Sequence, residues 1–147
     1  MNEQVYFDMT YGMFILGAKD GNRDTGCVVN TVFQVTNTPS QLAVSVNKDN
    51  FTSTCISKNK IFAVAILSET TPPERIGIFG FQSGKDVNKF DGVGKLEASG
   101  VPVMKDGICG YLICKVKTEV DCGTHILYIA EVTDGDRFEG REPMTYA

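Results

Sequence analysis

The chain of 147 residues contains no tryptophan, one histidine and five prolines, and it lacks any long apolar run. Its longest such run, residues 61–67, is far shorter than the about 20 residues needed to span a bilayer. Residues 1–8 are polar and acidic, without the basic start and small-residue cleavage site of a secretory signal. We therefore expect a cytoplasmic protein with no membrane segment.

Positive charge is also scarce, because 14 Lys and Arg residues stand against 18 Asp and Glu residues and the net charge is −4. Nucleic-acid binding depends on basic residues that neutralise phosphates, so no nucleic-acid partner is expected. An acidic chain can still bind one small anion where hydrogen-bond donors gather locally. The length and the ordinary share of apolar residues, 42%, predict one folded domain over residues 1–147.

The five cysteines fit neither a disulfide framework nor a metal site. Their number is odd and no two have C-x-x-C spacing. A metal site can be drawn from Cys109, Cys114, Cys122 and His125. However, the first two lie an odd number of residues apart in an expected strand, so they face opposite sides of it. We expect no metal, and cysteines that pack as small apolar side chains.

Apolar and β-branched residues recur with the periodicity of strands. The expected strands are residues 11–18, 26–36, 42–46, 60–68, 108–120 and 125–132. The fourth is almost continuously apolar, which indicates a strand buried on both faces. Asp20-Gly21 and Gly123 predict turns.

Helical signals are few. Asn50 is a good N-cap for a short helix over residues 51–58. Thr71, followed by two prolines, predicts the start of a helix that runs toward Phe79. The glycine-bearing stretch 77–100 is expected to be irregular. Together these patterns predict a mainly β protein, a barrel with one to three short helices.

Hydrogen-bonding side chains gather where the strand over 42–46 ends and the first helix begins. They are Ser45, Asn47, Lys48, Asn50, Thr52, Ser53 and Thr54. A helix N-terminus presents free N–H groups and the positive end of the helix dipole, which favours a phosphate. The alternative is a helix cap in a polar surface turn, and the residue types fit both equally.

Two other segments could contact a ligand. Asn30, Thr31 and Gln34 interrupt an apolar strand, where they could bind a planar heterocycle or face solvent on an edge strand. The stretch 77–90 combines aromatic residues, glycines and two lysines, as a loop over a ligand would. Neither it nor residues 92–95 match the dinucleotide-binding or P-loop glycine motifs.

His125 is the only histidine, so any histidine-dependent catalysis would have to use it. No nucleophile signature accompanies it, and a lone histidine in a strand is more often structural. Hydride or electron transfer needs no titrating side chain, because a cofactor supplies the chemistry.

Taken in order, these segments resemble the flavin reductase-like, FMN-binding split-barrel family, and within it the flavoredoxins and the flavin domain of high-molecular-weight rubredoxins. The similar segments are 11–12, 26–36, 44–48 with Asn50 and Thr52, 79–90, 123–125 and 142–146. The resemblance implies a Greek-key split barrel that forms a homodimer and binds FMN near the dimer interface.

The resemblance also implies which residues hold the FMN. Asn30, Thr31 and Val32 would lie along the isoalloxazine ring. The residues around the ribityl chain and phosphate would be Ser45, Val46, Asn47, Asn50, Thr52, Ser53, Ser83 and Lys89. His125, in a Gly-Thr-His sequence where relatives often carry Gly-Asp-His, would stand on the flavin and nicotinamide side as the candidate catalytic residue.

The implied activity is that of an FMN-dependent oxidoreductase that moves hydride or electrons. Its partner would be NAD(P)H or a separate rubredoxin-like protein, since the chain has no Cys-x-x-Cys pairs for rubredoxin iron. The alternatives are an FMN electron carrier that does not oxidise NAD(P)H directly, and a non-catalytic β-barrel binding module.

Overall fold

The computed structural model describes residues 1–85 and 87–146. The helices are the 3₁₀ helix η1 (Glu3–Asp8) and the α-helices α1 (Phe51–Asn59) and α2 (Pro73–Phe81). The strands are β1 (Tyr11–Gly12), β2 (Phe14–Asp20), β3 (Arg23–Val29), β4 (Val32–Asn37), β5 (Ser40–Asn47), β6 (Ile61–Leu67), β7 (Lys95–Ala98), β8 (Val101–Met104), β9 (Ile108–Asp121), β10 (His125–Arg137) and β11 (Thr145–Tyr146). The prediction of a mainly β protein with a few short helices is confirmed. Within these residues no helix is long and apolar enough to cross a bilayer.

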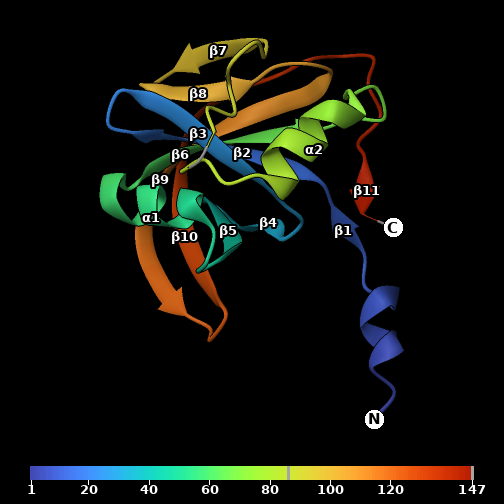
Figure 1. Ribbon diagram of the computed structural model, residues 1–147. Helices are drawn as coiled ribbons and strands as arrows, with labels where there is room; N and C mark the ends of the chain where they lie inside the picture. Colours follow the sequence, from blue (N-terminus) through green and yellow to red (C-terminus); the bar gives the residue numbers. More distant parts are fainter. Residues whose placement is uncertain (86, 147) are drawn as a thin grey trace.

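Seven strands form one antiparallel sheet in the order β3-β2-β6-β9-β10-β5-β4. The two edge strands, β3 and β4, are joined by Asn30 and Thr31 alone. Three Cα–Cα steps reach only about 11 Å, so the sheet must roll until its edges meet. This gives a barrel that is split between β3 and β4, with α2 on its outside (Figure 1).

The central strands are buried on both faces. On β6, Phe62 and Val64 belong to one apolar cluster, whereas Ala63 and Ala65 belong to a second. The first cluster also takes residues from β3 and β5, near opposite edges of the sheet, and is therefore the barrel interior. The second lies on the outer face, against α2 and the β7–β8 hairpin. The interpretation of residues 60–68 as a strand buried on both faces is confirmed.

Helix α1 is fixed to the barrel at its N-terminal end. Its cap is the predicted one, since Asn50 Oδ1 accepts a hydrogen bond from the Thr52 N–H at 3.0 Å. The fully buried Tyr128 of β10 donates its hydroxyl to the Ser53 carbonyl at 3.0 Å and lies 2.8 Å from Ser57 Oγ. The bonds of Tyr128 therefore hold α1 against β10.

The prediction of a single strand over residues 26–36 is wrong. It is interrupted at Asn30 and Thr31, which cross from one edge of the sheet to the other. Periodicity along the chain cannot show this break, because both halves are β-branched and extended. The break depends on the order of strands in the sheet.

The predicted start of α2 is also wrong. The helix begins at Pro73, after Pro72, and has no side-chain cap. Thr71 instead donates its hydroxyl to the Gly107 carbonyl at 3.0 Å and accepts from the Ser68 N–H at 3.1 Å. The stretch expected to be irregular also contains the end of α2 and the strand β7.

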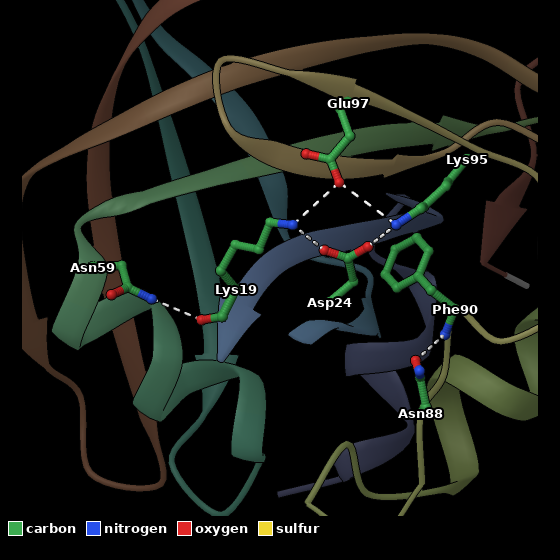
Figure 2. A network of polar contacts seen from close by, with 7 residues as sticks. All are labelled: Lys19, Asp24, Asn59, Asn88, Phe90, Lys95 and Glu97. Carbon is green, nitrogen blue, oxygen red and sulfur yellow. Dashed lines mark hydrogen bonds and ion pairs between the residues drawn. The ribbon is translucent and has the colours of Figure 1, made fainter. Parts of the chain in front are cut away.

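Four charged side chains connect the β2–β3 hairpin to β7 (Figure 2). Lys19 Nζ lies 2.5 Å from Asp24 Oδ1 and 3.1 Å from Glu97 Oε1, and Lys95 pairs with the same two carboxylates. Burial by itself would raise the pKa of Asp24, but the hydrogen bonds from both lysines outweigh it and hold the pKa below its ordinary value. The network therefore ties the outer hairpin to the barrel with balanced charge.

Candidate functional site

A cavity of about 540 Å³ opens where the two edges of the barrel meet. Its lining residues are Met13, Val28, Val29, Asn30, Thr31, Ser45, Val46, Asn47, Asn50, Cys122 and His125. The volume is in the range of sites for small organic ligands. Apolar side chains alternate with neutral amides and hydroxyls, and these lining residues include none of the described Asp, Glu, Lys or Arg side chains.

The corner between β5 and α1 forms one wall of the cavity. Asn47 organises this corner, because its carbonyl accepts from the Asn50 N–H at 3.0 Å and its Oδ1 from the Asp49 N–H at 2.9 Å. The Ser45 N–H donates to the Thr31 carbonyl at 3.1 Å, which ties the crossing residues to β5. Backbone hydrogen bonds therefore fix the positions of the amide and hydroxyl side chains at this wall.

The β9–β10 turn, beside the end of β5, also lines the cavity. Gly123 has a φ of +96°, a conformation that glycine adopts without strain. Asp121 accepts from the Gly123 N–H at 2.9 Å and lies 2.5 Å from Lys48 Nζ. The hydrogen bond from Lys48, with that from Gly123, holds the pKa of Asp121 below its usual range. This pair fastens the turn to the end of β5 and brings Cys122 and His125 to the cavity.

His125 pairs with Asn47 across the β10–β5 ladder, so the two residues meet at the cavity. Its Nδ1 lies 2.8 Å from Thr124 Oγ1. The threonine hydroxyl thus orients the imidazole ring from the neighbouring position.

The structure brings seven of the predicted site residues together at this cavity. They are Asn30, Thr31, Ser45, Val46, Asn47, Asn50 and His125. The others do not line it. Thr52 and Ser53 are buried in the first turn of α1, and Val32 packs against the interior cluster. Ser83 is exposed and lines a smaller cavity on the other side of Asn50.

Lys89 does not lie at the cavity. Its side chain is only 2% exposed, and Nζ donates to the Gly26 carbonyl at 2.7 Å and the Phe79 carbonyl at 3.0 Å. Burial lowers the pKa of this ammonium, against a smaller opposing effect of Cys27. Phe79 is in the last turn of α2, where the backbone carbonyls have no donor within the helix and therefore attract a cation. Lys89 therefore links α2 to β3 in this structure.

Sequence reasoning missed four lining residues, which are Met13, Val28, Val29 and Cys122. The first three are apolar residues in or beside strands, and no local signal separates them from core residues. Cys122 had a usable signal, because it immediately precedes the turn glycine and stands three residues before His125.

Comparison with known proteins identifies the family. Residues 6–147 match the family described as flavin reductase like domain. The chain belongs to the flavin reductase-like family. This confirms the resemblance inferred from the ordered segments, and with it the assignment to flavin reductase-like oxidoreductases.

Two relatives align with this flavin reductase-like chain over its whole length. It is 41% identical over 148 residues to the high molecular weight rubredoxin of Moorella thermoacetica, covering 100% of this chain and 65% of that protein. It is 36% identical over 148 residues to the ferric-chelate reductase (NAD(P)H) of Archaeoglobus fulgidus, covering 100% of this chain and 88% of that protein.

Among solved structures, the NADH:FAD oxidoreductase of Streptomyces globisporus has the same fold as this flavin reductase-like chain. The TM-score is 0.88 at 22% identity, over 98% of this chain and 85% of that one. The likeness confirms the predicted split-barrel fold.

Proposed function

We propose that this chain is an FMN-dependent oxidoreductase that transfers electrons or hydride through a flavin held in the large cavity. The observation that supports it is the cavity itself. Six residues of the expected FMN-binding set, together with His125, line one opening of about 540 Å³ in this flavin reductase-like chain.

The lining residues suit the parts of FMN. The isoalloxazine ring has flat apolar faces and a polar edge, which match Met13 and Val28 on the one hand and Asn30 and Thr31 on the other. The ribityl chain carries hydroxyls, which match Ser45 and Asn47. A bound flavin supplies hydride and electron transfer, while these residues bind it, orient it and exclude water.

The phosphate would lie near Asn50, at the N-terminus of α1. The positive end of the helix dipole favours an anion there. Because Lys89 is engaged with two carbonyls, binding of the phosphate rests on this helix end and on neutral donors rather than on a lysine.

For the electron donor we propose NAD(P)H, bound at the same cavity on the side of His125. The A. fulgidus relative is named as an NAD(P)H enzyme, and the S. globisporus structure has been solved with NAD and FAD fragments. The chain spans 65% of the M. thermoacetica protein named as a rubredoxin. That relationship supports a rubredoxin-like protein as the second redox partner.

We also propose a homodimer. The edge strand β4 exposes Phe33 and Val35 at 55% and 46%, and η1 has no buried residue. A second copy would remove these apolar side chains from water. Light scattering at micromolar concentration would show twice the chain mass, and a monomer would contradict the proposal.

Anaerobic reduction tests the activity. The FMN-loaded protein is mixed with NADH or NADPH in separate experiments, and the flavin absorbance near its visible maximum is followed. Bleaching at a catalytic rate by either nucleotide is expected. Bleaching by dithionite alone would contradict the NAD(P)H step, and would favour a carrier that is reduced by a protein partner.

A further inference from the structure

The large cavity presents a single imidazole to any charge that develops inside it. Among the described residues that line it, none is Asp, Glu, Lys or Arg, and only Cys122 and His125 have side chains that can gain or lose a proton. His125 is half-buried, so its ring borders the cavity and still exchanges protons with water. A negative charge in the cavity therefore meets no fixed cation among these residues.

The charged side chains around His125 lie outside the cavity lining. Asp121 Oδ1, in the β9–β10 turn, lies 2.5 Å from Lys48 Nζ at the end of β5, so the two charges offset each other. The hydrogen bond from Lys48 holds the pKa of Asp121 below its usual range, and Asp121 therefore takes up no proton near neutral pH. Asp49, at the β5–α1 corner, lines the smaller cavity on the other side of Asn50.

Thr124 suits a ring that changes its charge. Its Oγ1 lies 2.8 Å from His125 Nδ1. A hydroxyl can both donate and accept, so it can donate to Nδ1 of the neutral ring and accept from the Nδ1–H of the charged ring. A carboxylate at this position would instead favour the charged ring alone. The contact with Thr124 thus holds the imidazole in place in both protonation states.

Any charge in the cavity lies close enough to act on this ring. A volume of about 540 Å³ corresponds to a sphere about 10 Å across, which is about one Debye length in ordinary buffer. Salt therefore screens the interaction only in part. Apolar lining residues such as Met13 and Val28 lower the local dielectric constant and strengthen it further.

We propose that His125 takes up a proton when the flavin in the large cavity is reduced. Hydride from NAD(P)H brings two electrons and one proton, which leaves one negative charge on the flavin ring. A second proton, from water, binds to the imidazole and offsets that charge. On reoxidation the two electrons leave the flavin, and the imidazole returns its proton to water. The proposal rests on the proposed function, since the charge arises on the flavin.

Proton NMR of untagged, FMN-loaded protein tests the proposal directly, because the chain has one histidine and its ring signal is unambiguous. The protonation midpoint of the ring is measured in the oxidised protein and again after full reduction with dithionite. We expect the midpoint to rise by about one pH unit on reduction, a tenfold gain in affinity for the proton. Equal midpoints in the two redox states overturn the proposal.

The redox potential gives a second measurement. In a two-electron couple each proton taken up changes the potential by about 30 mV for a tenfold change in proton concentration. Between the two midpoints, wild type should take up about half a proton more per two electrons than His125→Asn. Cys122→Ser is the matched control, because Cys122 is the other titratable group of the lining, and it should keep the wild-type value.

Two results of this measurement contradict the proposal. One is a His125→Asn variant that takes up as many protons as wild type. The other is loss of the extra proton in Cys122→Ser, which would assign that proton to the thiol. Failure of the wild-type chain to bind FMN overturns the proposed function as well. FMN that binds and is reduced without proton uptake at His125 leaves the proposed function standing.

Discussion

Asn50 combines a helix cap with a position at the proposed flavin site. Its side chain caps α1, and the same residue lines both cavities. Its role in stability and its proposed role in binding can be separated, because aspartate caps a helix as well as asparagine does but adds a negative charge. A substitution of this single residue can therefore test where the phosphate lies.

Replacement of Asn50 by aspartate should leave stability unchanged and weaken FMN binding. The cap is kept, so we expect a Tm within about 2 °C of wild type. The added charge beside the phosphate should weaken FMN about tenfold, or about 1.4 kcal/mol. Asn2→Asp is the control, since Asn2 caps η1 in the same way. Equal FMN affinity in both variants would contradict a phosphate at this helix end.

The cysteines should differ in reactivity according to their burial. Burial raises the pKa of Cys27 to about 11 and that of Cys114 to about 12, so neither thiol should react with a disulfide reagent at pH 8 in the folded protein. Cys122 is exposed and lines the large cavity. It should be modified first, and FMN should slow its modification at least fivefold. A rate unaffected by FMN would contradict a flavin in this cavity.

At the scale of elements, local patterns predicted those features that neighbouring residues determine. The cap at Asn50, the turn at Gly123 and the doubly buried β6 all follow from residue type and period. The position of Lys89 does not, because two carbonyls from distant elements bind its ammonium. From the sequence alone, a lysine in a glycine-rich stretch fits a phosphate ligand and a structural link between elements equally well.

Lys89→Met should affect stability more than binding. The variant fills the same space but leaves the Gly26 and Phe79 carbonyls without their donor, and should lower the free energy of unfolding by about 2–3 kcal/mol. FMN affinity of the folded protein should stay within threefold. Lys85→Met, an exposed lysine of the same loop, is the control. A tenfold loss of FMN affinity at unchanged Tm would instead place Lys89 at the phosphate.

The network around Asp24 should make part of the stability depend on pH. The folded-state pKa of Asp24 is lowered, so its contribution is present above the unfolded pKa of about 4 and is lost as pH falls through the folded value. Asp24→Asn should lower the free energy of unfolding by about 1–3 kcal/mol at pH 7.

Denaturant unfolding at several pH values measures this effect. The difference between wild type and Asp24→Asn should shrink as pH falls below about 4. Glu139→Gln is the control, because Glu139 forms only an exposed pair with Arg137 at 3.9 Å. If the difference in the free energy of unfolding between the two proteins did not depend on pH, the charge of Asp24 would not contribute to stability.

At the scale of the whole molecule, the cavity is a consequence of how the barrel closes. The strand order places β3 and β4 at opposite edges, and the two-residue crossing brings those edges together with the β5–α1 corner and the β9–β10 turn. The chain order of motifs was enough to identify the family. The residues that support the site instead of lining it could be separated only once the strand order and burial were known.

Titration of the apoprotein with FMN tests the central claim most directly. Quenching of flavin fluorescence should saturate at one FMN per chain, and Asn47→Ala should weaken binding at least tenfold, because Asn47 both lines the cavity and organises its corner. Asn37→Ala, at the far end of β4, should bind as wild type does. Absence of saturable binding, or equal affinity in the two variants, would contradict a flavin site at the split of the barrel.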